Sequence, residues 1–301
     1  MRAVVFSRYG DESVLELTRR PAPAPADGDV LVEVKAAGVN PVDWKYREGA
    51  VRSDLPFPLG MGWDVSGVVR ATVPGGPAIG DEVYGMLPLP YGGAYQELAV
   101  LPASAVAPKP ARLTHTEAAA VPLAALTAWQ ALEAAGAKPG LRVLVHAGAG
   151  GVGHFAVQLA RHLGAHVTAT ASARNLDFLR RLGVDEPIDR VTAELAAGAP
   201  FDVVLDTVGG PVQHASWGLL RPGGTLITLP EPVDETYRLP GITARRVIVT
   251  PDGKALRRIG TLIDSGAVHV EVQAVLPLEE AAEAHRISKE GRVRGKLVLS
   301  L

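Results

Sequence analysis

The sequence predicts an α/β protein in which a doubly wound parallel sheet of the Rossmann type is combined with a β-rich domain. Strand-like and helix-like segments alternate with short connections between residues 142 and 229, a pattern typical of parallel sheets. The first third instead holds short strand-like runs separated by Pro- and Gly-rich turns, which indicates a twisted, barrel-like antiparallel domain. The chain of 301 residues is long enough for both domains.

The β-rich region ends in a change of texture near residue 115. Before it, strands are expected at residues 4–6, 14–17, 30–36, 67–72, 82–84 and 94–100. Thr114 and Glu117 have the spacing of a capping box, which predicts that a helix begins there. The Ala-rich residues 117–135 are expected to be helical with an interruption at Pro122.

The alternating region predicts four strands and three helices. The strands are expected at residues 142–146, 166–170, 203–206 and 225–229, and the helices near 152–163, 175–182 and 211–220. From about residue 251 the pattern changes again. A helix near 253–265, a strand at 268–274, a helix from 277 to about 289 and a last strand at 297–301 complete the expected order.

The composition narrows the possible function classes. A hydrophobic fraction of 47% and a charged fraction of 21% fit a globular protein, and a net charge of −2 gives no indication of nucleic acid or anionic membrane as partner. No apolar run approaches the roughly 18 residues of a membrane span, and no signal-peptide pattern follows the first strand, so a cytoplasmic location is expected. The chain has no cysteine, which excludes disulfides, a thiol nucleophile and cysteine-ligated metal.

A glycine-rich turn is the strongest functional motif. Gly148, Gly150 and Gly153 have the spacing G-x-G-x-x-G between a strand-like run and a helix pattern, which is the context that a dinucleotide fingerprint requires. Such a turn lets the backbone approach a pyrophosphate at a helix N-terminus. The alternative is a turn that binds nothing. The residues predicted to bind the cofactor here are Ala147, Gly148, Gly150, Gly151, Val152 and Gly153.

Beyond these patterns, the chain resembles the zinc-independent quinone oxidoreductase (ζ-crystallin-like) branch of the medium-chain dehydrogenase/reductase superfamily. The segments that carry the resemblance lie at 38–49, 58–67, 80–83, 92–97, 127–132, 148–153, 202–210 and 294–299. The resemblance implies a GroES-like catalytic domain formed by residues 1–121 and 247–301, and a Rossmann NADPH-binding domain formed by residues 122–246. It also implies a homodimer joined at sheet edges, with residues 247–249 as the expected edge strand.

The resemblance also bears on metal binding. Zinc alcohol dehydrogenases place a His-Glu pair after a glycine where this chain has Gly62-Trp63-Asp64. A catalytic zinc site needs three protein ligands and a water, so no metal site is predicted. Trp63 either forms a wall of the quinone pocket or fills the space that the metal would occupy.

The residues after the second predicted strand of the sheet favour NADPH over NADH. An acidic residue about twenty positions after the first glycine would hold the ribose of NAD, but residues 168–172 contain none. Ser172 and Arg174 suit a 2′-phosphate instead. The alternative for Arg174 is a solvated charge at a helix start.

Further cofactor contacts complete the prediction. The resemblance adds Thr127 and Arg190 as cofactor contacts. Alternatively, Arg190 is a solvated charge in a loop. The remaining predicted cofactor contacts are Asn175, Val208 and Lys296. His146, at the end of the strand before the glycines, is expected to be a hydrogen-bonded structural histidine.

The candidate catalytic residues lie in the segment 38–49. By resemblance, Asn40 and Asp43 line the substrate pocket, and Lys45 stands where well-studied relatives often have a tyrosine. Lys45 either holds the substrate oxygen or forms an ion pair with Asp43, and Tyr46 faces either toward or away from the pocket. Three of these residues also have a purely structural interpretation. Asn40 would start a turn, Asp43 would cap a helix, and Lys45 would be a solvated charge.

Together these features predict a zinc-free, NADPH-dependent oxidoreductase that transfers a hydride to a quinone or another conjugated carbonyl. The alternatives are a reductase of enone or enoyl carbon–carbon double bonds, and an NADPH-binding sensor with little turnover. No residue is identified as a general acid, so the proton is expected to come from solvent.

Overall fold

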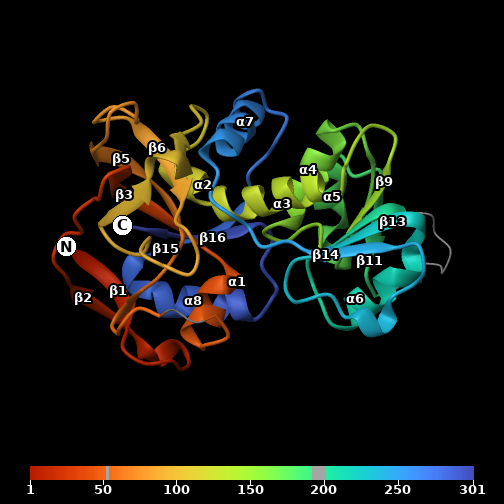
Figure 1. Ribbon diagram of the computed structural model, residues 1–301, viewed down its shortest axis with the longest axis horizontal. Coiled ribbons are helices and arrows are strands. Elements are labelled where there is room, and N and C mark those ends of the chain that lie inside the picture. Colours follow the sequence, from red (N-terminus) through yellow and green to blue (C-terminus); the bar gives the residue numbers. More distant parts are fainter. Residues whose placement is uncertain (52–53, 192–200) are drawn as a thin grey trace. The chain divides into compact units, whose positions relative to one another are not determined.

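The computed structural model describes residues 1–51, 54–191 and 201–301 (Figure 1). The chain divides into two compact units. Unit 1 comprises Met1–Leu126, Thr250–Gly266 and Val270–Leu301, and unit 2 comprises Thr127–Val249 and Ala267–His269. The predicted fold class is confirmed, because one unit holds a wholly parallel sheet and the other is rich in antiparallel strands. Within the described ranges, no helix is both long enough and apolar enough to cross a membrane.

Unit 2 is built on a six-stranded parallel sheet. In chain order its strands are β9 (Arg142–Val145), β10 (His166–Ala171), β11 (Glu186–Asp189), β12 (Phe201–Asp206), β13 (Leu220–Thr228) and β14 (Thr243–Arg246). They lie in the order β11-β10-β9-β12-β13-β14. This order reverses between β9 and β12, and in such sheets ligands bind where the order reverses, beyond the carboxyl ends of the strands.

Helices connect these strands. The α-helices are α4 (Gly153–His162), α5 (Leu176–Arg181) and α6 (Pro211–Ser216), and the short 3₁₀ turns are η3 (Ala173–Asn175), η4 (Trp217–Leu219) and η5 (Glu235–Tyr237). Residues 143–145 of β9 are all buried, as expected for a central parallel strand covered on both faces. One core cluster is made by Leu144, Phe201, Val204, Trp217, Leu219, Leu220, Leu226 and Ile242.

Unit 1 contains two sheets. A seven-stranded sheet has the order β15-β16-β3-β5-β6-β8, with β7 also paired to β3, and a three-stranded sheet has the order β2-β1-β4. The strands are β1 (Arg2–Phe6), β2 (Leu15–Arg19), β3 (Asp29–Val39), β4 (Leu59–Gly60), β5 (Asp64–Ala71), β6 (Glu82–Met86), β7 (Leu98–Pro102), β8 (Val106–Pro108), β15 (Val272–Pro277) and β16 (Lys296–Ser300). Because β16 pairs antiparallel with β3, the C-terminal segment is part of the same sheet as the first third of the chain.

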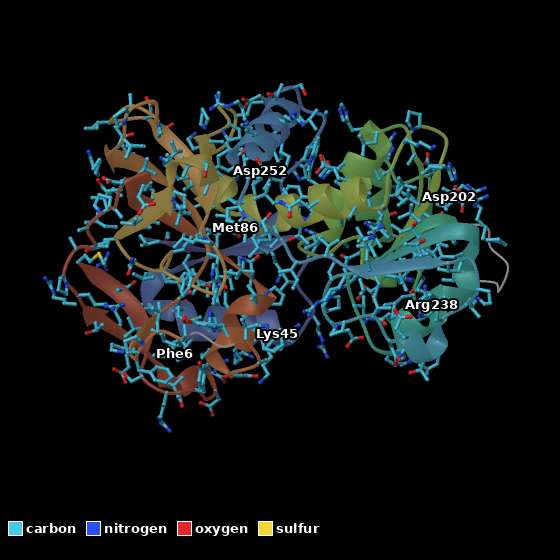
Figure 2. All side chains as sticks on the ribbon, viewed as in Figure 1. Phe6, Lys45, Met86, Asp202, Arg238 and Asp252 are labelled. Carbon is cyan, nitrogen blue, oxygen red and sulfur yellow. The ribbon has the colours of Figure 1, made fainter. Side chains whose placement is uncertain are left out.

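The helices of unit 1 cover these sheets. They are α1 (Pro41–Arg47), α2 (His115–Ala119), α3 (Pro122–Ala134), which continues into unit 2, α7 (Gly253–Asp264) and α8 (Ala281–Lys289), with the 3₁₀ turns η1 (Glu12–Val14), η2 (Ala103–Ala105) and η6 (Leu278–Glu280). Asp252, labelled in Figure 2, caps α7 by accepting hydrogen bonds from the backbone N–H groups of Lys254 and Ala255 at 2.9 and 3.0 Å. The predicted break at Pro122 separates α2 from α3.

Two predicted strands lie elsewhere. The strand expected at 268–274 begins only at Val272, because the backbone N–H and C=O of His269 are bound by the side chain of Gln158 at 2.7 and 3.0 Å and so cannot join a ladder. The edge strand expected at 247–249 is wrong by a few residues. The edge strand of the parallel sheet is β14, which ends at Arg246.

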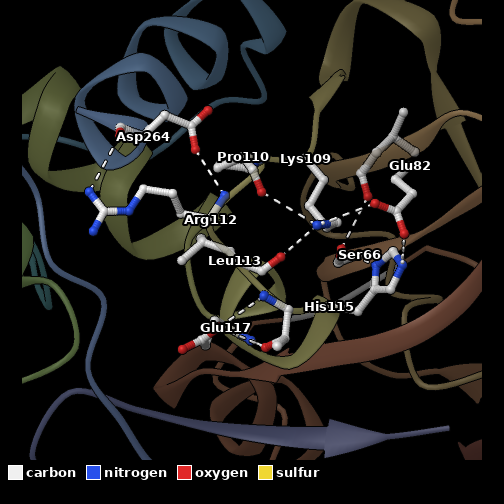
Figure 3. Close-up of polar contacts among 11 residues, drawn as sticks. Ser66, Glu82, Lys109, Pro110, Arg112, Leu113, His115, Glu117 and Asp264 are labelled. Atoms are coloured by element: carbon white, nitrogen blue, oxygen red, sulfur yellow. Dashed lines mark hydrogen bonds and ion pairs between the residues drawn. The ribbon is translucent and has the colours of Figure 1, made fainter. Parts of the chain in front are cut away.

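A polar cluster in unit 1 holds α2 against β5 and β6 (Figure 3). The Nδ1 of His115 lies 2.8 Å from Ser66 Oγ, and its Nε2 lies 3.1 Å from Glu82 Oε1. These residue types match a hydrolytic triad, but Ser66 is buried and its hydroxyl donates to the carbonyl of Val83 at 3.2 Å. A nucleophilic serine must be accessible and must donate to the histidine, so this cluster is a structural clamp.

The core of unit 2 predicts a contrast between two leucines. Leu226 is fully buried in the core cluster, whereas Leu239 is 43% exposed. Leu226→Ala should lower the free energy of unfolding by about 2–5 kcal/mol, because it leaves a cavity. Leu239→Ala should stay within about 0.5 kcal/mol of wild type. Urea unfolding followed by circular dichroism measures both, and equal losses would contradict the assignment of this core.

Candidate active site

Helix α1 begins at Asn40 because the local sequence satisfies its first turn. Asn40 is the N-cap residue, Pro41 follows at the first helical position, and the Asp43 Oδ2 accepts a 2.7 Å hydrogen bond from the Asn40 backbone N–H. Proline is favoured at that first position and an acidic residue two places later returns a bond to the cap. Asp43 therefore does cap α1, which was the structural interpretation of this residue.

Asn40 and Asp43 also belong to a buried polar network in unit 1. The Tyr95 hydroxyl donates to Asp43 Oδ2 at 2.6 Å, and the Asn40 Nδ2 donates to Asp64 Oδ2 at 2.8 Å. The ammonium of Lys296 donates to the Asn40 Oδ1 and to the backbone carbonyl of Val39, and lies 3.9 Å from Asp64 Oδ2. All of these side chains are buried, Lys296 with 3% exposure being the most accessible.

The Asp64 carboxylate also holds a second helix. Its Oδ1 accepts a 2.7 Å hydrogen bond from the backbone N–H of Leu123, the second residue of α3. A carboxylate at a helix N-terminus satisfies a backbone donor that has no partner within the helix, and it interacts favourably with the helix dipole. Asp64 therefore connects β5, α1 and α3 through one side chain.

The network contains two carboxyl groups and one ammonium. Burial raises the pKa of Asp43 to about 7, an effect that the Tyr95 hydroxyl and the Asn40 backbone N–H reduce. Burial also raises the pKa of Asp64 to about 6, opposed chiefly by Lys296 and Asn40. Burial lowers the pKa of Lys296 and raises that of Tyr95 well above its ordinary value. Asp64, which lies closer to the ammonium, ionises first, and Asp43 holds a proton up to near neutral pH.

The structure changes the reading of Asn40 and Lys296. Both ends of the Asn40 amide are engaged inside unit 1, by Asp64 and by Lys296. The ammonium of Lys296, a predicted cofactor contact, is directed into this same network. Both side chains therefore hold β3, α1 and β16 together, and direct contact with substrate or cofactor stays a prediction for each.

The other candidate catalytic residues lie around an aromatic cluster. The ring of Tyr46 packs edge-to-face against Trp63 and Phe6, with centroids 5.2 and 5.4 Å apart, and both Tyr46 and Trp63 are buried. Trp63 is thus part of the packed interior of unit 1, and both of its predicted roles stay predictions. Lys45 is half-buried on α1 (Figure 2), and its Nζ lies 5.6 Å from the centroid of the Trp44 ring. Asp43 takes its hydrogen bonds from Tyr95 and Asn40, and not from Lys45.

Sequence reasoning missed two members of the network. Tyr95 lies within the resembling segment 92–97 and Asp64 within Gly62-Trp63-Asp64, but the sequence predicts neither as a site residue. A signal for Asp64 existed, because it is an acidic residue in a strand otherwise rich in valine. Buried acids almost always have a partner, but the partners at positions 40 and 296 are too distant in sequence to be found by spacing.

In unit 2 the fingerprint glycines have different roles. A Cβ on Gly148 would lie 2.8 Å from the Ala169 Cβ, and one on Gly153 would lie 2.2 Å from the Ala147 carbonyl oxygen, so packing alone requires both glycines. A Cβ on Gly150 would meet only the Ala147 oxygen, at 3.3 Å. Gly150 is thus the least crowded of the three, in a turn of the kind through which a ligand can approach the backbone closely.

A group of polar and basic residues gathers at the carboxyl ends of β10 and β11. Ser172 directly precedes the η3 turn, which carries Arg174, and the Asn175 Nδ2 donates to Ser172 Oγ at 3.3 Å. The backbone N–H of Arg190 donates to the carbonyl of Ala171 at 2.9 Å, so Arg190 lies beside this turn. The structure thus brings together the backbones of four predicted cofactor contacts at the ends of two strands, namely Ser172, Arg174, Asn175 and Arg190.

The loop after β12 presents Val208. The carboxylate of Asp206 accepts hydrogen bonds from the backbone N–H groups of Val208 and Gly209, at 2.8 and 2.9 Å. Val208 itself is 48% exposed.

Thr127, which is predicted to contact the cofactor, is buried in α3. No group of three His, Asp or Glu side chains suited to a metal ion occurs among residues 1–51, 54–191 and 201–301.

Comparisons with known proteins agree with this architecture. The family described as "Alcohol dehydrogenase GroES-like domain" matches residues 26–111, and the family described as "Zinc-binding dehydrogenase" matches residues 182–299. The chloroplast envelope quinone oxidoreductase homolog of Arabidopsis thaliana is 34% identical over 99% of this chain and 98% of its own. The 2-methylene-furan-3-one reductase of Solanum lycopersicum is 35% identical over 99% of this chain and 79% of its own.

Solved structures show the same relationship. The quinone oxidoreductase of Coxiella burnetii has a TM-score of 0.93 and 34% identity, covering 100% of this chain and 99% of its own. This protein belongs to the quinone oxidoreductase branch of the medium-chain dehydrogenase/reductase superfamily. The Escherichia coli quinone oxidoreductase, solved with NADPH, has a TM-score of 0.89 at 26% identity and covers 100% of both chains. Membership makes the protein an oxidoreductase and supports a nicotinamide cofactor.

The raised pKa of Asp43 predicts how stability responds to pH. The folded value of about 7 lies above the roughly 3.9 of an exposed aspartate. Protonated Asp43 therefore contributes stability that is full below about pH 4 and is lost as the pH rises through about 7. Asp43→Asn removes this titration, so the variant should gain stability relative to wild type as the pH rises, by at most about 1.4 kcal/mol per pH unit. Urea unfolding between pH 4 and 7.5 measures this, and a difference independent of pH would contradict a neutral Asp43.

Proposed function

We propose that this member of the quinone oxidoreductase branch is a zinc-free, NADPH-dependent enzyme that transfers a hydride to a quinone or another conjugated carbonyl. The observation that carries the proposal is the glycine turn of unit 2. Close packing requires Gly148 and Gly153, and a Cβ on Gly150, in the turn that leads into α4, would meet a single neighbour, the Ala147 carbonyl oxygen at 3.3 Å. An adjacent turn offers a hydroxyl and an arginine in place of the acid of NAD-binding proteins.

The residues of unit 2 fit a dinucleotide phosphate. Gly150 and the first N–H groups of α4 would hold the pyrophosphate, and Ser172 with Arg174 would hold the 2′-phosphate. When bound, the reduced nicotinamide supplies the hydride. An acid does lie near this turn, because Asp189 is in register with Ala171. Its carboxylate accepts a 3.1 Å hydrogen bond from the Val191 backbone N–H, which ties it to its own loop.

In unit 1, helix α1 carries the cation Lys45, and buried residues fix the first turn of that helix. The network around Asn40 and Asp43 fixes the first turn of α1, and Lys45 follows on that helix with part of its side chain accessible. Negative charge develops on the substrate oxygen when a hydride is added, and a positioned ammonium stabilises it. Asp43 and Asp64 have no exposed surface, so we assign the final proton to solvent.

The donor set supports a site without zinc. The sequence has no cysteine. Asp64, at the former zinc-ligand position, already accepts hydrogen bonds from Asn40 and Leu123 and lies beside the ammonium of Lys296. A cation already compensates this carboxylate, and a second cation so close to it would be repelled.

A second candidate function is the reduction of enone carbon–carbon double bonds. The tomato relative is named for such a reaction, at 35% identity. Both reactions begin with hydride addition to a conjugated system. Product analysis with 9,10-phenanthrenequinone, a naphthoquinone and simple enones separates them, and binding of NADPH without turnover of any would favour a sensor.

The Arg174 side chain should determine how much more tightly the protein binds NADPH than NADH. Arg174→Ala should raise the Kd for NADPH at least about tenfold, because a charge-assisted contact to the 2′-phosphate is lost. The Kd for NADH should not change. The matched control is Arg180→Ala, since Arg180 is an exposed arginine of α5 paired with Asp177. Fluorescence titration measures each Kd, and similar wild-type affinities for NADH and NADPH would contradict the proposal.

Substitution of Lys45 tests whether its ammonium contacts the substrate oxygen. Lys45→Met should lower kcat for quinone reduction by about tenfold to a hundredfold, because the developing charge on oxygen loses its cation. Lys289 offers a matched control, because its Nζ lies 5.9 Å from the centroid of the same Trp44 ring. Lys289→Met should keep wild-type turnover. If both variants keep wild-type kcat and KM, Lys45 does not touch the substrate.

A further inference from the structure

A chain of buried hydrogen bonds runs through unit 2 from the glycine turn to helix α6. It begins at the backbone N–H of Ala147, which lies 3.2 Å from Thr170 Oγ1. Thr170 Oγ1 lies 3.2 Å from His146 Nδ1, and His146 Nε2 lies 3.2 Å from Ser216 Oγ. The chain ends where the Ser216 hydroxyl meets the carbonyl oxygen of Val212 at 2.7 Å.

Only one arrangement of protons satisfies every atom of this chain. The Val212 carbonyl can only accept, so the Ser216 hydroxyl donates to it and its oxygen accepts from His146 Nε2–H. The Ala147 N–H can only donate, so the Thr170 oxygen accepts there. A neutral ring that carries its proton on Nε2 has Nδ1 free to accept, so the Thr170 hydroxyl donates to Nδ1. The two ends therefore specify the neutral Nε2–H tautomer of His146.

The environment of His146 agrees with this tautomer. The ring is buried, His146 follows the last residue of β9, and the ring meets α6 at that helix's last residue, Ser216. Burial lowers the pKa of His146 to about 4, so the ring is neutral at physiological pH. A protonated ring would donate from both nitrogens, and the Thr170 hydroxyl would lose its acceptor.

The chain joins two loops that carry predicted cofactor contacts. Ala147 has a φ of +49°, a left-handed conformation that is strained for a residue with a side chain, and its N–H is held by Thr170. On the other side, the Thr207 hydroxyl donates to the His146 carbonyl oxygen at 2.8 Å, directly before Val208. His146 is therefore bonded through its ring to α6 and through its backbone to the loop after β12.

We infer that His146 is a positioning residue that couples the glycine turn to the loop at residues 207–210, so that both present their backbone to the same cofactor. The inference rests on the proposed function, because it requires NADPH to bind at this turn. His146 touches neither the reacting atoms nor the substrate in this role. It acts through Ala147 and Thr207, which it holds in one relative arrangement.

The test breaks the chain at either end and leaves the histidine in place. Thr170→Val and Ser216→Ala should each raise the Kd for NADPH about five- to tenfold, because each leaves a buried polar group without its partner. The double variant should lose less than the product of the two single effects, since one break already frees the ring. At saturating NADPH, kcat should remain at the wild-type value, which separates positioning from catalysis.

A matched control lies two residues away on the same strand. Thr168 is buried on β10, and its hydroxyl donates to Glu186 at 3.1 Å and not to the chain. Thr168→Val should bind NADPH as wild type does, even if its unfolding midpoint falls. This control distinguishes the loss of a specific link from the general cost of changing a buried threonine.

Two further measurements examine the histidine itself. Nitrogen-15 NMR of the cofactor-free protein at pH 7 should show His146 as the neutral Nε2–H tautomer. His146→Leu should raise the Kd for NADPH about tenfold, whereas His146→Asn should lose only about two- to threefold, because its amide oxygen can accept from Thr170. An Nδ1–H tautomer, or equal losses in both variants, would overturn the inference.

The outcomes also separate this inference from the proposed function. If wild type binds NADPH but Thr170→Val and Ser216→Ala bind it as tightly as Thr168→Val does, only the inference fails. If wild type binds no nicotinamide nucleotide, the proposed function fails and the inference with it. Weaker binding in the two chain variants, with the control unchanged, supports the inference.

Discussion

The pairing of the Lys296 ammonium with the Asp64 carboxylate is the interaction on which the interior of unit 1 depends. Lys296 stands at the start of β16 and its ammonium meets the end of β3 at Val39 and Asn40. Asp64 uses its two oxygens for α1 and α3. Removing one member of such a buried pair leaves an uncompensated charge, which typically costs about 3–5 kcal/mol. The geometry of α1 is thus determined by residues from both ends of the chain.

In unit 2, hydrogen bonds between neutral groups fix the conformation around the glycine turn. The backbone of Ala147 is strained, and the direction of each hydrogen bond around it leaves the His146 ring a single tautomer. Buried polar groups are costly when unpaired, so a fully paired chain selects one conformation among those that packing allows. In both units, buried polar groups that bond to one another fix the backbone next to residues predicted to bind substrate or cofactor.

The sequence predicted the fold class and the family, because hydrophobic periodicity, glycine spacing and turn residues are local signals. The four expected strands of the parallel sheet and the helices between them lie close to their expected positions, whereas β11 and β14 are strands that the sequence did not predict. The prediction was wrong where a tertiary contact replaced the local preference. Residues 268–271 have the composition of a strand, but the Gln158 amide occupies the backbone of His269.

For the site, the sequence by itself determined which residue types were present: the glycine turn, Ser172 and Arg174, and the polar residues of the segment 38–49. It also determined that no thiol is available. Only the tertiary structure decided that Asn40 and Lys296 face each other and that Asp64 and Tyr95 join them. The physical reason is that a buried charge is satisfied by whatever partner the sheet brings to it. The pairing of β16 with β3 joins residues more than 250 positions apart, which no spacing rule can show.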